Sequence, residues 1–391
     1  MNILLVRPPR IKQAVTLGEF MFCEPIGLEI VYGVLKDRYQ IRILDLMIEE
    51  NMLNEECKSF KPDIVGITSL CIDVNAVKDI AQKVKMINLN VVTVVGGTQA
   101  FLNPEAFFCD SIDHVMKYTT RNNLNQLYDT LAAKQDIPLI DGIHSKVNSY
   151  QSTECFGRNE YIVPDRSSTQ KYRQYYSYLG YKPCAIMQTS LGCSKNCDFC
   201  LRWRLEGKTE QDIDLNIIID QIKEIQEPSI MIYDNDFLNN GVRLEAFCDL
   251  LEKNDIKKNF ICYTSVKSII SHPDTIKRVT KNGLRAVLVG YETFSPLTPF
   301  PNLPLYDQYR DRLLFDVEAY EQWSFGKVSI RPSRISLRRY YYEMVKTILF
   351  VNLFMNSTSY MMKRFGFSTL LRLFIGSIKV MPADLKLMIK S

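Results

Sequence analysis

Three cysteines close together in the chain are the residues best suited to chemistry. Cys193, Cys197 and Cys200 stand in a CxxxCxxC spacing directly after a strand-like run. Three thiolates on one short loop can bind three irons of a cubane cluster and leave the fourth iron open. A closed structural zinc site needs four ligands. Cys184 or Cys262 could in principle be the fourth, but neither stands in a second CxxC pair. The spacing therefore favours an iron–sulfur cluster over zinc or three structural cysteines.

An aromatic residue, Phe199, immediately precedes the last of these cysteines. The spacing together with this aromatic resembles the signature of the radical S-adenosylmethionine (SAM) superfamily. In that family three cysteines hold a 4Fe-4S cluster, and the open iron binds SAM through its amino and carboxylate groups. Reductive cleavage of SAM then gives a 5′-deoxyadenosyl radical, while the protein orients the reactants and excludes water. The resemblance implies a cluster on Cys193, Cys197 and Cys200, a cofactor contact at Phe199, and a flavodoxin or ferredoxin as electron donor.

Two further polar motifs match positions at which the family binds SAM. Asp234, Asn235 and Asp236 follow an apolar run, where family members place polar groups that hold the amino end of SAM. The alternative is an Asx turn or a helix N-cap, since Asp and Asn favour both. Glu292 lies in a Gly-Tyr-Glu-Thr run that resembles the family's Gly-x-Glu-Ser, whose carboxylate sits near SAM. Its alternative is a solvated or ion-paired glutamate.

The first third of the chain alternates short apolar runs with amphipathic stretches of helical spacing. Such alternation predicts an α/β domain over residues 1–134, built on a doubly wound parallel sheet of Rossmann type. Its ligand crevice should lie beyond the carboxyl ends of the strands. The predicted strands are Ile3–Val6, Ile41–Leu44, Ile64–Thr68 and Val91–Val95, and the predicted helices are centred on Leu28–Leu35 and Val74–Val84.

Three short motifs in this domain resemble the cobalamin-binding domain that precedes many radical SAM barrels: Glu24-Pro-Ile-Gly-Leu28, Asp63–Ser69 and Val95–Ala100. Two adjacent glycines after a strand permit close approach of the backbone to a ligand. The resemblance implies cobalamin contacts at four positions, Ser69, Gly96, Gly97 and Thr98.

The domain also departs from the cobalamin-binding pattern. No Asp-x-His-x-x-Gly motif is present, so no histidine is placed to ligate cobalt from below, as is usual in this subfamily. Lys117–Asn122 stands where relatives carry a Gly-Glu-Gly-Glu-like loop that contacts the cobalamin tail. A domain that has lost its cofactor therefore remains an alternative.

The composition changes after the first domain. Residues 135–184 are rich in Pro, Gly, Ser and Tyr and read as a linker, in which Val163-Pro-Asp-Arg166 also matches the family. Residues 185–326 resume the strand–helix alternation and predict a radical SAM (βα) barrel with its chemistry at the carboxyl ends of the strands. The chain passes from Phe294 to the Thr-Pro-Phe-Pro run without the helix, strand and helix that relatives carry there. The barrel is therefore expected to be partial and shortened.

Residues 327–391 form a basic tail with twelve Lys and Arg against two acids, whereas the rest of the chain has a net charge of −6. The tail is expected to be helical from about Ile335, with an apolar stripe at Tyr341, Met344, Val345, Ile348, Leu349 and Leu353. Basic residues beside such a stripe suit a helix lying on an anionic bilayer, and the alternative is a tail packed on the barrel. Ile330–Tyr340 is similar to the region that closes lipid-acting members such as hopanoid methylases.

Length and composition set the remaining expectations. The 391 residues, with 46% hydrophobic and 24% charged, suffice for two globular domains. No run of 18 apolar residues or export signal is seen, so we expect a cytoplasmic protein with peripheral membrane contact through its tail and no nucleic-acid partner. The leading hypothesis is a cobalamin-dependent radical SAM methyltransferase acting on an unactivated carbon of an apolar lipid or polycyclic substrate. The alternatives are a cyclase or oxidoreductase of the same architecture, and a catalytically silent binding protein.

Overall fold

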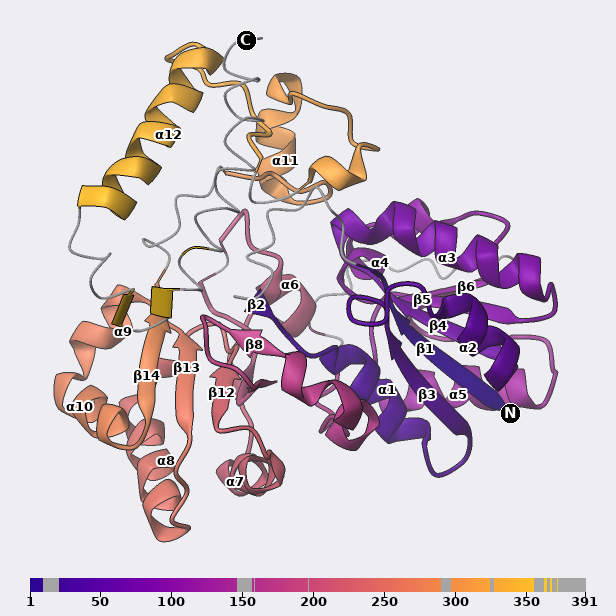
Figure 1. Ribbon diagram of the computed structural model, residues 1–391, viewed down its shortest axis with the longest axis horizontal. Helices are drawn as coiled ribbons and strands as arrows, with labels where there is room; N and C mark the ends of the chain where they lie inside the picture. Colours follow the sequence, from indigo (N-terminus) through magenta and orange to yellow (C-terminus); the bar gives the residue numbers. More distant parts are fainter. Residues whose placement is uncertain are drawn as a thin grey trace.

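The computed structural model describes residues 1–9, 21–145, 157, 159–195, 197–289, 297–323 and 327–354, together with 362, 363, 366, 367 and 371. For residues 348–354 it describes the backbone alone. Two α/β units lie side by side, the first in indigo and purple and the second in pink and orange (Figure 1). The predicted fold class is confirmed, because each unit is built on a mainly parallel sheet.

The first unit contains a six-stranded sheet in the order β3-β1-β4-β5-β6-β7. The strands are β1 (Asn2–Arg7), β3 (Gln40–Asp45), β4 (Ile64–Thr68), β5 (Val92–Gly96), β6 (His114–Met116) and β7 (Ile143–Ser145). All neighbours pair in parallel except β6 and β7, which are antiparallel. Four of these strands coincide closely with the strands predicted from apolar runs.

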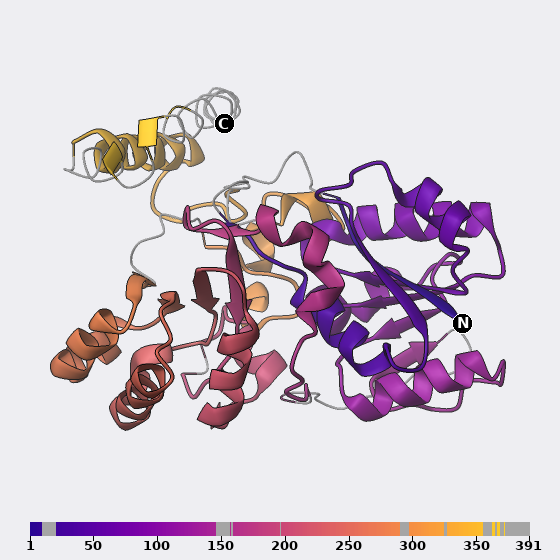
Figure 2. The ribbon, with the colours of Figure 1, turned by 60° about the horizontal axis from the view of Figure 1, so that its bottom comes forward.

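Alternate side chains of these strands supply two separate cores, one on each face of the sheet. Leu4 and Val6 of β1 pack with α2 (Leu53–Phe60) and α3 (Val74–Ile87) on one face. Ile3 and Leu5 pack with α1 (Ile26–Leu35) and α5 (Arg121–Ala132) on the other. Helices accordingly cover both faces of the sheet (Figure 2). Burial on both faces explains why the strands read as continuous apolar runs.

The last strand of this sheet comes from the segment that the sequence assigned to the linker. Residues 143–145 pair with β6, so the first sheet extends past the predicted boundary at residue 134. Gly142 permits the turn into β7, since its φ is +80° and a Cβ there would lie 2.7 Å from the Tyr118 ring. A three-residue strand carries too little periodicity to be seen in the sequence.

The second unit contains a four-stranded parallel sheet in the order β14-β13-β12-β9. Its strands are β9 (Cys184–Met187), β12 (Ser229–Ile232), β13 (Asn259–Tyr263) and β14 (Leu284–Leu288). Its helices are α7 (Leu215–Glu224), α8 (Gly241–Lys253), α9 (Val266–Ser271) and α10 (Pro273–Lys281). In the described part of the chain no further strand joins this sheet after β14, in agreement with the expected partial barrel.

Short elements connect and flank the two units. These are β2 (Met21–Phe22), η1 (Cys71–Asp73), α4 (Thr98–Leu102), η2 (Pro104–Phe107), η3 (Arg166–Tyr175), β8 (Ser177–Tyr178), β10 (Ser190–Leu191), α6 (Arg202–Glu206), β11 (Gln211–Asp212), η4 (Phe237–Asn239), α11 (Pro304–Tyr309), η5 (Arg310–Arg312) and η6 (Tyr320–Gln322). The linker is packed rather than extended, since β8 pairs with β2 and the Tyr172 and Tyr176 side chains are fully buried.

The tail begins with α12 (Leu337–Phe354), which confirms the predicted helix. The helix stands apart from both sheets in the two views (Figures 1 and 2). Tyr341 of the predicted stripe is buried and Met344 and Val345 are half-buried, while the side chains of the stripe from Ile348 onward lie outside the described residues. Among the helices that the structure describes, none is both long and apolar enough to cross a bilayer.

Candidate functional site

The loop that carries the three cysteines follows β9 and is fixed at its start by backbone geometry. Leu191 of β10 pairs with Gln211 of β11, and the next residue, Gly192, has a φ of +83°. A Cβ at Gly192 would lie 2.0 Å from the Thr209 carbonyl oxygen, so only glycine fits. The Cys193 N–H then donates to the Gly207 carbonyl at 3.1 Å. The first cysteine is therefore held at a defined point beside the strand end.

The other end of the loop is held by α6. The Trp203 indole N–H donates to the Cys197 carbonyl at 2.9 Å, and the Arg204 guanidinium donates to the Cys200 carbonyl at 2.8 Å. These two bonds use the carbonyl groups of Cys197 and Cys200 and do not involve their thiols. Phe199 is 56% exposed, so its ring is not packed in the core and is open to a bound molecule. Its contact with a cofactor stays a prediction.

The chemistry of the donors fits a cluster with three protein ligands. Cys193, Cys197 and Cys200 are partly exposed, whereas Cys184 and Cys262 lie fully buried in β9 and β13. Burial raises the pKa of the Cys184 and Cys262 thiols, which disfavours the thiolate that a metal needs. The structure thus removes the two cysteines considered as a fourth zinc ligand.

The three thiols do not themselves converge. Within the described residues, no group of three or more His, Cys, Asp or Glu side chains gathers around one point as metal ligands do. The loop provides three thiolate donors at the right chain spacing, and the assignment of Cys193, Cys197 and Cys200 as cluster ligands stays a prediction.

The Asp-Asn-Asp run after β12 makes three different contacts. Asp234 is 1% exposed and accepts hydrogen bonds from the Thr189 N–H at 2.7 Å and the Thr189 hydroxyl at 2.5 Å. It therefore connects the ends of β12 and β9, a structural role that is neither the Asx turn nor the N-cap considered for this run. Burial raises the pKa of Asp234. Asn235 instead donates to the Gly192 carbonyl at 2.6 Å, directly beside Cys193.

The Asp236 carboxylate reaches from the end of β12 to the start of α9, where it accepts several hydrogen bonds. It accepts from the Thr264 hydroxyl at 2.8 Å, the Ser265 N–H at 2.9 Å and the Ser268 hydroxyl at 2.9 Å, and it pairs with Lys195 of the cysteine loop. Desolvation acts against ionisation, but the Lys195 ammonium and these donors together hold the pKa of Asp236 below its ordinary value. An ionised carboxylate is thus maintained next to the cysteines.

A cavity of about 390 Å³ lies between the cysteine loop and α9. Its wall includes Cys193, Lys195, Asn235, Asp236 and Ser268. Two of the predicted SAM contacts, Asn235 and Asp236, therefore share one cavity with the first cysteine, and Asp234 does not line it. Glu292, the remaining predicted contact, lies outside the described residues.

A second cavity, of about 340 Å³, lies between the two units. All four predicted cobalamin contacts line it: Ser69, Gly96, Gly97 and Thr98. Gly97 has a φ of +96°, and a Cβ there would lie 2.7 Å from the backbone of Ser69. The Ser69 hydroxyl donates to the Gly96 carbonyl at 2.7 Å, which joins the ends of β4 and β5. The four predicted residues thus form one wall of the cavity, in which the backbone of the two glycines is not covered by side chains.

The opposite wall of this cavity comes from the second unit and the linker. It includes Gln188 at the end of β9, Tyr233 at the end of β12 and Tyr161 of the linker. Tyr233 donates to the Gln188 side-chain oxygen at 3.0 Å, and burial raises the pKa of Tyr233, so the phenol stays a donor. Sequence reasoning missed these residues, because no motif marks an amide and two phenols from separate segments as one wall.

Comparison with known proteins supports a cobalamin-binding domain in the first part of the chain. The family model described as "B12 binding domain" matches residues 20–127. The hopanoid C-3 methylase of Methylococcus capsulatus is 25% identical over 283 residues, which cover 70% of this chain and 54% of the methylase. This chain thus spans about half the length of that curated relative.

Two solved structures share the fold. The radical SAM methyltransferase TsrM of Kitasatospora setae, solved with tryptophan and a SAM analogue, has a TM-score of 0.55 and 16% identity and covers 76% of this chain and 60% of its own. The cobalamin-dependent radical SAM enzyme OxsB, solved with aqua-cobalamin and SAM, has a TM-score of 0.56 and 16% identity and covers 84% of this chain and 46% of its own. Over its first third this chain thus matches the B12-binding domain, and over most of its length it is similar in sequence or fold to radical SAM proteins that carry a cobalamin-binding domain.

Proposed function

We propose that this protein is a cobalamin-dependent radical SAM methyltransferase that modifies an unactivated carbon of an apolar lipid or polycyclic substrate. The observation that carries the proposal is the cavity between the units. One wall is the glycine-lined end of the B12-binding sheet, and the other includes Gln188 and Tyr233, at the ends of the strands that flank the cysteine loop. Cobalamin held against the first wall would therefore face the ends of the strands that lead to the cysteine loop.

The chain's own residues would divide the work between the two cavities. Cys193, Cys197 and Cys200 would hold the 4Fe-4S cluster, and Asn235 and Asp236 would present their polar groups to SAM in the adjacent cavity. Ser69, Gly96, Gly97 and Thr98 would hold cobalamin against the B12-binding sheet. When bound, the cluster supplies the electron that cleaves SAM, and cobalamin carries the methyl group.

The apolar character of the substrate is supported by the cavity wall. Besides its glycines, the wall includes Leu28, Val31, Ile67, Leu191 and Leu205. Apolar walls with a few placed polar groups are typical of sites for small apolar ligands. The named function of the Methylococcus relative, a hopanoid methylase, points to the same class of substrate.

Two kinds of partner belong to this proposal. A flavodoxin or ferredoxin would reduce the cluster. The basic tail would place the protein on an anionic membrane surface, where an apolar substrate is found; its described cations Arg338, Arg339 and Lys346 are exposed on or beside α12.

A catalytically silent binding protein is the second candidate. Its support is the four-stranded sheet, which lacks in the described residues the later strands of a complete barrel. Such a protein would retain the cavity between the units without the chemistry of the cysteine loop.

Iron and cobalt analysis of the anaerobically purified full-length protein tests the proposal. We expect both metals, SAM-dependent formation of 5′-deoxyadenosine, and a methylated product from an apolar extract. Iron without cobalt would indicate a cyclase or oxidoreductase of the same architecture. Absence of both metals after reconstitution would indicate the binding protein.

A further inference from the structure

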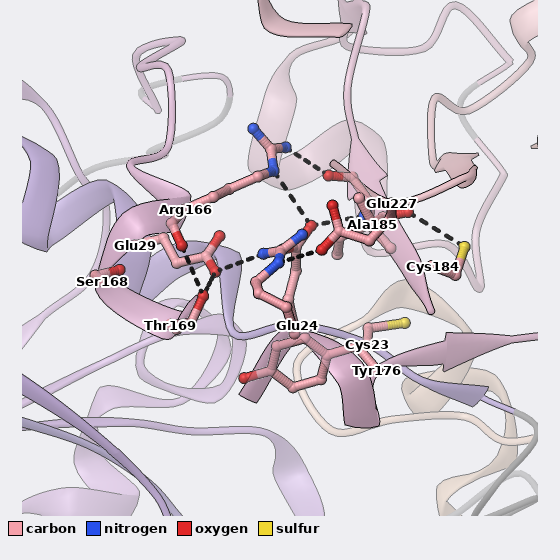
Figure 3. A network of polar contacts seen from close by, with 12 residues as sticks. Cys23, Glu24, Glu29, Arg166, Ser168, Thr169, Tyr176, Cys184, Ala185 and Glu227 are labelled. Carbon is pink, nitrogen blue, oxygen red and sulfur yellow. Dashed lines mark hydrogen bonds and ion pairs between the residues drawn. The ribbon is translucent and has the colours of Figure 1, made fainter. Parts of the chain in front are cut away.

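Four buried charged side chains and one half-buried arginine, Arg166, meet where the two units and the linker come together (Figure 3). Glu24 precedes α1, Glu29 lies within it, Arg166 and Arg173 belong to η3 of the linker, and Glu227 precedes β12. Glu24, Glu29, Arg173 and Glu227 are each at most 7% exposed. Burial of so many charges is costly unless each is paired, so the geometry of this cluster is constrained.

Arg173 is the centre of the cluster. Its guanidinium pairs with Glu24 and with Glu227, and it lies 3.3 Å from Glu29. Glu29 also accepts a hydrogen bond from the Thr169 hydroxyl at 2.5 Å. One linker arginine thus joins a residue of the B12-binding unit to a residue of the barrel.

Glu24 reaches further, to the barrel sheet itself. Its second carboxylate oxygen accepts from the Ile186 backbone N–H at 2.6 Å and lies 3.5 Å from Arg166. Arg166 in turn donates to the Ile186 carbonyl at 2.7 Å. Ile186 lies in β9, the edge strand of the sheet. The two side chains therefore satisfy the backbone groups that a neighbouring strand would otherwise bond.

These contacts connect the walls of the two predicted cofactor sites. Glu24 directly precedes α1, whose Gly27, Leu28 and Val31 line the cavity between the units. β9 leads through Gln188, which lines the same cavity, to the cysteine loop. The Glu24 carboxylate thus bonds the start of α1, which lines one wall of this cavity, to β9, which leads into the other wall.

The charges in the cluster balance only with Glu29 protonated. Desolvation and the neighbouring Glu24 charge raise the pKa of Glu29 to about 8, although Arg173 and Arg166 oppose the shift. Neutral Glu29 leaves two carboxylates facing two guanidinium groups. Loss of the Glu24 charge would remove the anion that both guanidinium groups contact and would lower the pKa of Glu29, so the cluster would have to rearrange.

We infer that Glu24 is a positioning residue that holds the α1 wall of the cobalamin cavity in register with β9 and the cysteine loop. The inference rests on the proposed function, since it assigns Glu24 to the distance between two proposed cofactors. Glu24 itself lines neither cavity.

Trp203 provides a reporter of that distance, because its indole bonds to Cys197 of the loop and the chain has only two tryptophans. In a W323F background of the full-length protein, hydroxocobalamin should shorten the Trp203 fluorescence lifetime by energy transfer. We expect E24Q to bind hydroxocobalamin but to show a shifted and broadened lifetime distribution. The control K36M removes a more exposed ion pair between the α1 region and the linker, the 2.6 Å contact with Asp165, and should match the parent.

If E24Q binds hydroxocobalamin and its lifetimes match those of the parent, the inference is wrong. If the parent shows no binding of hydroxocobalamin, the proposed function fails first and the inference fails with it. Should E24Q not fold, the double variant E24Q/R173Q removes both charges of the Glu24–Arg173 ion pair. The same shift in the Trp203 lifetime is expected from this double variant. Parent-like lifetimes in that double variant would equally overturn the inference.

Discussion

The two candidate cofactor sites are built in different ways. The wall at Ser69 and Gly97 is made of backbone, and strand pairing with a glycine at positive φ fixes it without any ligand. The cysteine loop is held by side-chain and backbone contacts at Gly192, Lys195 and α6, and its thiols do not converge in the described structure. A backbone site is thus formed by folding itself, whereas thiols that share a cluster need the irons to bring them together.

The largest effect is expected at the cysteine loop. Replacing Cys193, Cys197 and Cys200 together by Ala should abolish iron binding, the brown thiolate-to-iron absorbance and all SAM cleavage, because every protein ligand is removed. Cobalamin binding should persist, since its wall is formed separately. The control is C109A, which removes a partly exposed thiol of the first unit. Iron retained by the triple variant would refute the ligand assignment.

The backbone site should respond to a single methyl group. G97A places a Cβ 2.7 Å from the Ser69 backbone at a φ of +96°, so we expect a loss of about 1–3 kcal/mol in the free energy of unfolding. Hydroxocobalamin affinity, measured by absorbance titration, should fall by about tenfold or more, equivalent to about 1.4 kcal/mol.

G96A is the matched control for that prediction, since its added Cβ has no neighbour closer than 3.9 Å. It should cost far less stability than G97A. Equal effects of the two substitutions would show that backbone conformation does not distinguish the adjacent glycines.

The tail should be separable from both sites. Truncation before Ile335 should abolish binding to phosphatidylserine-containing vesicles and leave the iron content unchanged, because α12 lies apart from both sheets. Each basic group near an anionic surface contributes about 1 kcal/mol, so binding of the full-length protein should weaken with salt. A full-length protein that ignores such vesicles at low salt would contradict the membrane proposal.

A smaller effect concerns the buried charges between the sites. The pKa of Glu29 is raised from 4.5 to about 8, so between these values the folded protein holds a proton that the unfolded chain releases. Stability should therefore fall as the pH rises through this window, by at most about 1.4 kcal/mol per pH unit. In E29Q this contribution to the slope should disappear, as measured by urea denaturation at a series of pH values. An unchanged slope would show that Glu29 is ionised in the folded protein.

Much of the architecture was predictable from the sequence. Buried parallel strands read as apolar runs, and so β1, β3, β4 and β5 lie close to their predicted positions. The position of the two adjacent glycines at a cavity was also predictable, because Gly97 must adopt a conformation that other residues avoid. A backbone conformation that only glycine adopts readily can be inferred from the sequence alone.

Other features depended on contacts between distant segments. Asp234 and Asp236 belong to one motif, yet only the fold shows that the first bonds Thr189 while the second lines a cavity with Lys195. The wall formed by Gln188 and Tyr233 likewise assembles from separate strand ends.

Three features could be read from the chain before it was folded: the spacing of the three cysteines, the conformation required at Gly97, and the order of a B12-binding unit before a partial barrel. The burial of Arg173, from the Pro- and Ser-rich linker, among Glu24, Glu29 and Glu227 arises only in the folded chain. Local patterns record local conformational demands, whereas a buried charge is stable only beside partners that the chain brings from elsewhere. The relation between the two cofactor sites is therefore a property of the fold.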